Sequence, residues 1–331
     1  MAGSLTVCRK ELADVLGSKR YIVLFALIFL MSTMSAYQGA QFISNNTGSN
    51  FLAIFYGSQF GFSFTTLMVY FGPIIGLALG FDAINKERTS GSLSVTLCQP
   101  IYRDSIINGK ILAATASLSL LVVSTIGIMC GVAVSILGFG PTLADVSKIG
   151  MYMLLTVIYL AFWLCLGILF STVTKKISTS ILMSVSVWIF CAMVISIVAG
   201  LLGNYLVPIS MPSGPGIGRG NSTNPFNSPE LRALFQQRNT LETNIRRISP
   251  SYLYNEAGSA ILGLIGGGGF GGGGFIEIGG GANPFRAAGA GDLTQALAMV
   301  WPQIMALIVG MIVCFAASYM LFLRQEIRPG G

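Results

Sequence analysis

The sequence predicts an all-α integral membrane protein with six transmembrane helices. Only 9% of its 331 residues are charged and 53% are hydrophobic, whereas about a quarter of the residues in a soluble domain are charged. The mean hydropathy is +0.74. Apolar residues also gather in runs long enough for a helix to cross a bilayer. These runs cover residues 21–38, 62–82, 110–137, 149–173, 178–203 and 297–323.

The positions of lysine and arginine predict how these spans are oriented, because basic residues favour the cytoplasmic side of short loops. With the N-terminus in the cytoplasm, the basic residues on that side are Arg9, Lys10, Lys19, Arg20, Lys86, Arg88, Arg103, Lys110, Lys175, Lys176, Arg324 and Arg328. Lys148 then lies in a short outer loop. We therefore expect a multi-pass protein of the cell membrane with both termini in the cytoplasm. The net charge of +7 is scattered over span ends, so membrane lipid and not nucleic acid is the expected partner.

Three segments follow one another along the chain. Residues 1–203 are expected to form a transmembrane domain with spans one to five, residues 204–296 an extracytoplasmic segment, and residues 297–331 the sixth span with a cytoplasmic tail. Residues 4–20 are amphipathic and predict a helix along the inner membrane surface. Its apolar face consists of Leu5, Cys8, Leu12, Val15 and Leu16. An ordinary cytoplasmic extension of the first span is the alternative.

The extracytoplasmic segment is predicted to contain two helices, near 229–248 and near 252–265, followed by a glycine-rich loop at 266–281. The first helix carries charges at i,i+4 spacing that predict an exposed ladder of ion pairs. Its members are Arg238, Glu242 and Arg246. Asn45 and Asn221 each begin a glycosylation sequon on the outer side.

Several classes of function are excluded by what the sequence lacks. It has no histidine and its six cysteines are widely spaced, so we expect neither a metal site nor a disulfide framework. Residues 111–143, 177–218 and 293–323 contain no Asp, Glu, Lys or Arg, which argues against an ion-coupled transporter and a charge-lined channel. No Walker-type nucleotide loop occurs. We expect no enzyme activity and no cofactor in this chain.

The most charged interruption of the apolar runs is residues 82–110, between the second and third spans. Within it, Leu93, Leu97 and Ile101 recur at helical spacing, and a glycine and a proline divide the segment into a short helix between two turns. Such a helix could dock a partner protein with its charged side. It could equally be a plain amphipathic loop helix without a partner, and spacing alone favours neither.

The same segment resembles the loop of ABC type-2 transporter permeases. The residues that carry the resemblance, in the family's order and spacing, are Glu87, Gly91, Leu93, Pro100, Arg103, Gly109 and Lys110. Residues 9–12 are similar to the family's basic entry helix, and residues 249–257 to a segment often found before its last span. The resemblance covers nearly the whole chain. The outer segment departs from it, because its glycine tract exceeds the short outer helices of many relatives.

The resemblance implies the permease subunit of an ATP-driven exporter, with a coupling helix near 86–106. The implied partners are an ABC ATPase, which would bind ATP and Mg, and a second permease copy. The residues expected to couple the permease to the ATPase are Lys86, Glu87, Arg88, Gly91, Leu93, Leu97, Pro100 and Arg103. Glu87 and Arg103 are expected to contact the ATPase, or to form a local ion pair that orders the loop; Arg103 could instead anchor at lipid headgroups.

Two other functions remain open. One is an ATP-driven mechanotransmitter or maturation permease, similar to the one that serves copper assembly of nitrous-oxide reductase, whose outer segment contacts an extracytoplasmic partner protein. The other is a membrane scaffold or sensor that transports nothing. An uncharged path through the spans suits a lipid, a peptide, a drug or a glycan.

Overall fold

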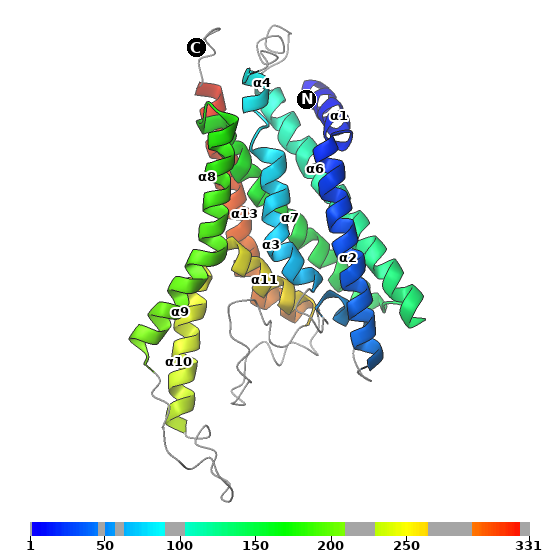
Figure 1. Cartoon of the computed structure of the whole chain (residues 1–331), viewed down its shortest axis with the longest axis vertical. Helices are drawn as coiled ribbons and strands as arrows, with labels where there is room; N and C mark the ends of the chain where they lie inside the picture. Colours follow the sequence, from blue (N-terminus) through cyan, green and yellow to red (C-terminus); the bar gives the residue numbers. More distant parts are fainter. Residues whose placement is uncertain are drawn as a thin grey trace, which may run out of the picture.

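The computed structural model of the protein describes residues 2–45, 50–56, 63–89, 103–208, 229–263 and 293–324. All regular secondary structure in these ranges is helical, which confirms the predicted all-α class (Figure 1). Five helical segments are long and apolar enough to cross a membrane. They are α2 (Lys19–Asn45), α6 (Arg103–Leu137), α7 (Leu143–Val173), the continuous run α8 (Ile177–Ile189), η2 (Phe190–Val194) and α9 (Ile195–Leu206), and α13 (Leu293–Arg324).

The remaining predicted run, residues 62–82, forms α3 (Phe64–Gly80), an apolar helix of 17 residues. At 1.5 Å per residue it is about 25 Å long, somewhat shorter than the hydrocarbon core of a bilayer. The hydroxyl of Ser63 caps its first turn by accepting a hydrogen bond from the Thr66 amide. A turn then leads into the short helix α4 (Asn85–Thr89).

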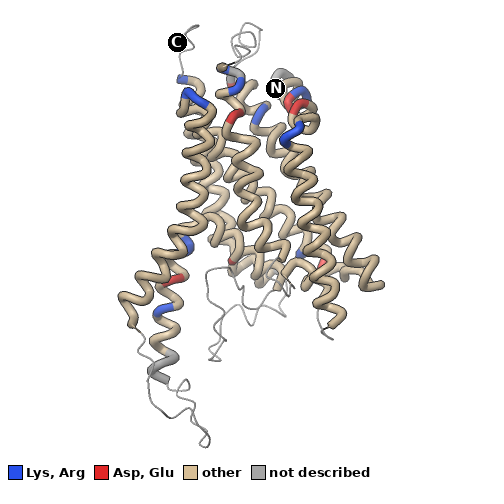
Figure 2. The backbone as a smooth tube through the Cα atoms, in the orientation of Figure 1, with Lys and Arg blue, Asp and Glu red and all other residues tan. Residues whose placement is uncertain are grey.

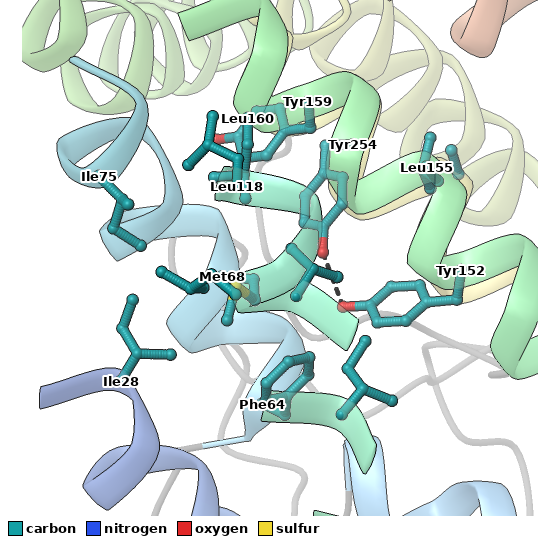
Figure 3. Close-up of a cluster of buried hydrophobic side chains, with 14 of the residues drawn as sticks. Ile28, Phe64, Met68, Ile75, Leu118, Tyr152, Leu155, Tyr159, Leu160 and Tyr254 are labelled. Carbon is teal, nitrogen blue, oxygen red and sulfur yellow. Dashed lines mark hydrogen bonds between the residues drawn. The ribbon is translucent and has the colours of Figure 1, made fainter. Parts of the chain in front are cut away.

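Helix α7 is the centre of the bundle. Its most apolar window is 61% buried, against 11–33% for the other four long spans. Helices α3 and α13 lie along it, and α11 (Pro250–Ile261) packs on α7, α13 and α3. Buried aromatic side chains fill the space between these helices, among them Phe64, Tyr152, Tyr159 and Tyr254 (Figure 3).

The backbones of α3 and α7 approach closely at glycine residues. A Cβ atom on Gly76 would lie 2.7 Å from the Leu160 carbonyl oxygen, and one on Gly80 would lie 2.6 Å from that of Leu164. Small residues allow this approach, which maximises van der Waals contact where the hydrophobic effect between helices is absent. Close backbone contact therefore holds the half of α3 that contains Gly76 and Gly80 against the most buried helix.

At the N-terminus, α1 (Ala2–Leu16) packs against α6. Its predicted apolar face is half-buried at four positions, whereas the side chain of Leu5 is 71% exposed. Gly17 and Ser18 separate α1 from α2, and the Ser18 hydroxyl donates to the Val15 carbonyl at 2.7 Å. It also accepts from the Tyr21 amide at 3.3 Å, so Ser18 joins the end of one helix to the start of the next.

The two helices expected in the segment before the last span are α10 (Pro229–Arg246) and α11. Helix α10 lies along α9, and the predicted ladder forms, with Glu242 paired to Arg238 at 2.9 Å and to Arg246 at 3.1 Å. The expectation that the ladder is exposed was wrong, because Glu242 lies over Gly203 of α9 and all three side chains are largely covered. The glycine-rich stretch 266–281 lies outside the described residues.

The contact between α3 and α7 generates a stability prediction. Gly80→Ala forces a methyl group against backbone atoms, which cannot swing aside, and should lower the free energy of unfolding by about 1–3 kcal/mol. The matched control is Gly131→Ala on α6, where a Cβ meets nothing within 4 Å. Thermal unfolding in detergent should show a lower midpoint for Gly80→Ala and an unchanged or higher one for the control. Equal midpoints would contradict the tight contact.

Candidate functional site

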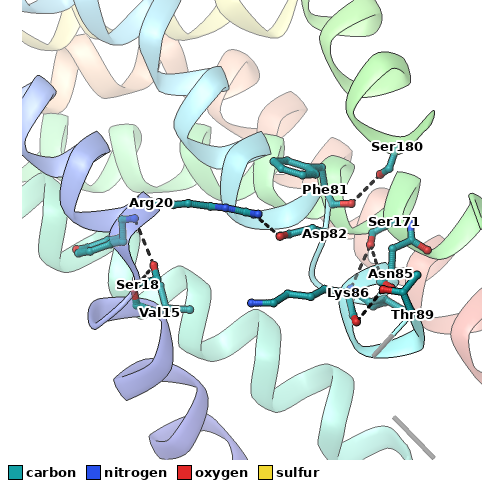
Figure 4. A network of polar contacts seen from close by, with 12 residues as sticks. Val15, Ser18, Arg20, Phe81, Asp82, Asn85, Lys86, Thr89, Ser171 and Ser180 are labelled. Carbon is teal, nitrogen blue, oxygen red and sulfur yellow. Dashed lines mark hydrogen bonds and ion pairs between the residues drawn. The ribbon is translucent and has the colours of Figure 1, made fainter. Parts of the chain in front are cut away.

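The turn between α3 and α4 is fixed to the end of α7 by hydrogen bonds (Figure 4). The amides of Ile84 and Asn85 both donate to the Ser171 hydroxyl oxygen, each at 3.1 Å. These amides belong to the first turn of α4, where a helix has no carbonyl partners of its own for its N–H groups. A side chain from α7 therefore completes the start of α4.

The side chains of Thr174 and Ser180 hold the same turn. Asn85 is fully buried, and the nitrogen of its side-chain amide donates to the Thr174 hydroxyl at 3.0 Å. The Ser180 hydroxyl of α8 donates to the Phe81 carbonyl at 2.8 Å. Because a buried polar group without a partner costs about 1–3 kcal/mol, this set specifies one position of α4 relative to α7 and α8.

An ion pair joins the turn to α2. Arg20 donates to the carboxylate of Asp82, and its guanidinium also lies 5.7 Å from the centroid of the Phe81 ring. The Asp82 side chain is largely buried, while that of Arg20 is 61% exposed. Loss of Arg20 would leave the largely buried carboxylate of Asp82 unpaired, whereas loss of Asp82 would leave a mostly exposed cation. The first loss should therefore cost more stability than the second.

A second ion pair joins α1 to α6. The Lys110 ammonium lies 3.0 Å from a Glu11 carboxylate oxygen, and both side chains are mostly buried. Figure 2 shows charged residues gathered at the end of the bundle that carries α1, α4 and the start of α6, with a second group around α10 and the start of α7. We refer to the first as the basic end. Its basic residues are Arg9, Lys10, Lys19, Arg20, Lys86, Arg88, Lys110, Lys175, Lys176 and Arg324.

The residues predicted to couple the chain to an ATPase fall on both sides of a gap in the description. Lys86, Glu87 and Arg88 belong to α4, and Arg103 is the first residue of α6. Lys86 is exposed, and Figure 4 shows its side chain extending away from Ser171 and Asn85. The other four lie outside the described residues: Gly91, Leu93, Leu97 and Pro100.

Sequence reasoning missed the residues that hold α4 in place, namely Ser171, Thr174 and Ser180 on α7 and α8. Hydroxyl residues at the inner end of an apolar run were the available signal, but such residues are common at span ends. The pair Arg20 and Asp82 had a stronger signal, since opposite charges at the same ends of two neighbouring spans would meet at the same depth.

The contacts at this end join helices to one another. Among the described residues, no three or more His, Cys, Asp or Glu side chains come together as metal ligands. The hydrogen bonds instead make α4 an extension of α7 and α3, and the two ion pairs tie α1 and α2 to the same end. A force on α4 would be carried directly into the most buried helix of the bundle.

The chain is similar to transporter proteins of a known family. The family described as "ABC-2 family transporter protein" matches residues 5–327 of the chain. A protein of Pseudomonas aeruginosa described as "Probable ABC transporter permease protein NosY" is 31% identical over 115 residues. That match covers 32% of this chain and 37% of the relative, well under two thirds of the relative's length.

The anchoring of α4 leads to a prediction for Ser171→Ala. The change removes the acceptor of two amides, so the free energy of unfolding should fall by about 1–3 kcal/mol. Amide hydrogen exchange at residues 84–89 should also speed up. Ser135→Ala is the matched control, because the hydroxyl of exposed Ser135 bonds to a carbonyl of its own helix. If exchange at 84–89 stays as slow as in the control, Ser171 does not hold α4.

Proposed function

Because this chain belongs to the ABC-2 family of transporter proteins and is a transmembrane subunit of an ABC transporter, we propose that it couples ATP hydrolysis by a separate ATPase to export across the cell membrane. In this proposal the ATPase binds ATP and Mg, and the chain itself carries no catalytic group. Two permease copies pair, and each binds one ATPase. The substrate path lies between the two copies.

The observation that carries the proposal is the double hydrogen bond from the start of α4 to Ser171. It makes α4 a rigid extension of the bundle at the basic end, where the coupling residues are expected from the family resemblance. Exposed Lys86 and the neighbouring residues 87–103 would present charges to the ATPase. A loosely attached loop could bind a partner but could not transmit force.

The topology that we propose has six spans, with α3 as the second and both termini in the cytoplasm. The gathering of basic residues at one end supports this orientation. Helix α3 is short, but the turn that follows it adds length at one end. Its packing along α7 also places it inside the bundle, so it can act as a span. The basic end is then cytoplasmic, and α10 and α11 belong to the outer side.

Transport follows from two states of the paired ATPases. ATP binding closes the ATPases and displaces the two α4 elements, and each displacement passes through Ser171 into α7 and through the turn into α3. The spans then move between inward-open and outward-open arrangements by rigid-body shifts. ATP must bind more tightly to one state than to the other, since equal affinity would shift nothing.

A second candidate function is mechanotransmission to an extracytoplasmic partner protein. It is favoured by α10, which extends past the outer ends of the other helices in Figure 1. Its base is tied to α11 by the ion pair of Arg247 with Glu256 at 2.6 Å. Deletion of residues 266–281 distinguishes the two: an exporter loses transport of its substrate, whereas a mechanotransmitter loses binding of its outer partner.

The proposal predicts the effect of reversing charges in residues 82–110, the segment that we call the coupling hairpin. The double variant Glu87→Lys with Arg103→Glu should stay folded but lose co-purification with the ATPase and the stimulation of ATP hydrolysis. Lys148→Glu, near the start of α7 at the opposite end, is the control and should leave both unchanged. If the double variant binds and stimulates the ATPase like the control, the coupling hairpin has been misassigned.

A further inference from the structure

Pro73 interrupts the hydrogen-bond ladder of α3, and we call the interrupted turn, residues 69–73, the kink. A proline inside a helix has no N–H group, so the carbonyl four residues earlier, that of Val69, loses its normal donor. In a membrane domain water cannot replace this donor. The Tyr159 hydroxyl of α7 donates to the Val69 carbonyl oxygen at 2.9 Å.

The surroundings of Tyr159 are shaped for this bond. A Cβ atom on Gly72, next to the proline, would lie 3.2 Å from the Tyr159 ring, so glycine leaves room for the ring to approach the kink. Since Tyr159 has one hydroxyl proton and gives it to Val69, it accepts from the Ser251 hydroxyl at 3.0 Å. Ser251 belongs to α11, so one oxygen atom joins three helices.

The ring of Tyr159 makes a second connection to α11. It stacks on Tyr254 with centroids 4.2 Å apart and planes 9° from parallel. The Tyr254 hydroxyl donates to that of Tyr152 at 2.8 Å (Figure 3). It also lies 3.0 Å from the hydroxyl of Thr156. Helix α11 is therefore held to α7 by several groups, but the bonds of Tyr159 also reach the kink of α3.

We propose that Tyr159 is a positioning residue that joins the kink of α3 to α11, so that movement of α3 at the basic end reaches α11. The inner half of α3, with Gly76 and Gly80, is packed on α7 and continues into α4. At the kink, the first half of α3 can change its angle relative to the half that is packed on α7. The Tyr159 hydroxyl bonds to this turn. The transmission of movement rests on the proposed function, whereas the joint itself does not.

The joint can be tested without an ATPase by a double-mutant cycle. Tyr159→Phe keeps the stacked ring and removes the hydroxyl, and should lower the midpoint of thermal unfolding in detergent. Pro73→Ala restores an N–H group that can bond the Val69 carbonyl within α3. In the Pro73→Ala background, Tyr159→Phe should lower the unfolding midpoint by about half as much as in the unmodified chain, or less.

Tyr152→Phe is the matched control for the cycle. It removes a buried hydroxyl from the same helix, one that bonds to Tyr254 and to Thr65 in the first turn of α3, but not to the kink. Its effect on the unfolding midpoint should be the same with and without Pro73→Ala. If the effect of Tyr159→Phe is also independent of Pro73→Ala, the hydroxyl does not serve the kink and the joint is overturned.

Transmission is tested with the complex of the chain and its ATPase in lipid vesicles. Exposed Ile248, just before α11, is replaced by cysteine in a background whose six native cysteines are alanine. Its rate of labelling by a membrane-impermeant maleimide should change when ATP and vanadate are added. The change should be lost with Tyr159→Phe and kept with Tyr152→Phe.

Two results would overturn transmission while the proposed function stands. They are an ATP-dependent change that survives Tyr159→Phe, and the absence of any change in a complex whose ATPase is stimulated. Failure of the ATPase to bind the unmodified chain would overturn the proposed function, and transmission with it. The double-mutant cycle would then still decide whether Tyr159 holds the kink.

Discussion

The absence of water inside a bilayer is the constraint on which the rest of this structure depends. Every backbone N–H and C=O group in the apolar part of the chain needs a partner from within the protein. Regular helices satisfy themselves, but this bundle is interrupted at several points. At the start of α4 and at the proline of α3, a hydroxyl group from another helix takes the place of the missing backbone partner.

Three hydroxyl groups fix irregular points of the bundle. Ser171 completes the start of α4, and Tyr159 completes the kink of α3. Ser249, just before α11, donates to the Cys191 carbonyl at 2.7 Å, within the π-turn η2. A π-turn disturbs the i,i+4 ladder and often marks a functional bend. The irregular points thus become fixed joints, and α7 takes part in two of them.

The class and the helices of this protein could be predicted from sequence, because hydropathy over about 20 residues reports directly on burial in lipid. The π-turn could not, since Phe190–Val194 is as apolar as its flanks. The ladder on α10 was predicted from its spacing, but the covering helix α9 was not, because a helical period carries no information on the neighbour. Gly203 leaves room for the Glu242 side chain, and this role can be recognised only when the two helices are seen together.

For the site, the charged residues could be predicted from the sequence but their anchoring contacts could not. Lys86 and Arg103 stand out by charge and by their place between two apolar runs. Ser171 gives no signal in a hydropathy pattern, and it lies 87 residues from Ile84, from whose amide it accepts a hydrogen bond. Contacts of such separation are set by how the helices pack, and a single sequence does not report packing. The bond from Tyr159 to the Val69 carbonyl, which spans 90 residues, was not predicted for the same reason.

Photo-crosslinking to the ATPase tests the central claim, that force enters this chain at α4. A photoreactive amino acid is placed at exposed Lys86 in one variant and at exposed Leu234 of α10 in another. The account predicts a crosslink to the ATPase from position 86 and none from position 234. A crosslink from 234 alone, or from neither position in a complex that hydrolyses ATP, would contradict it.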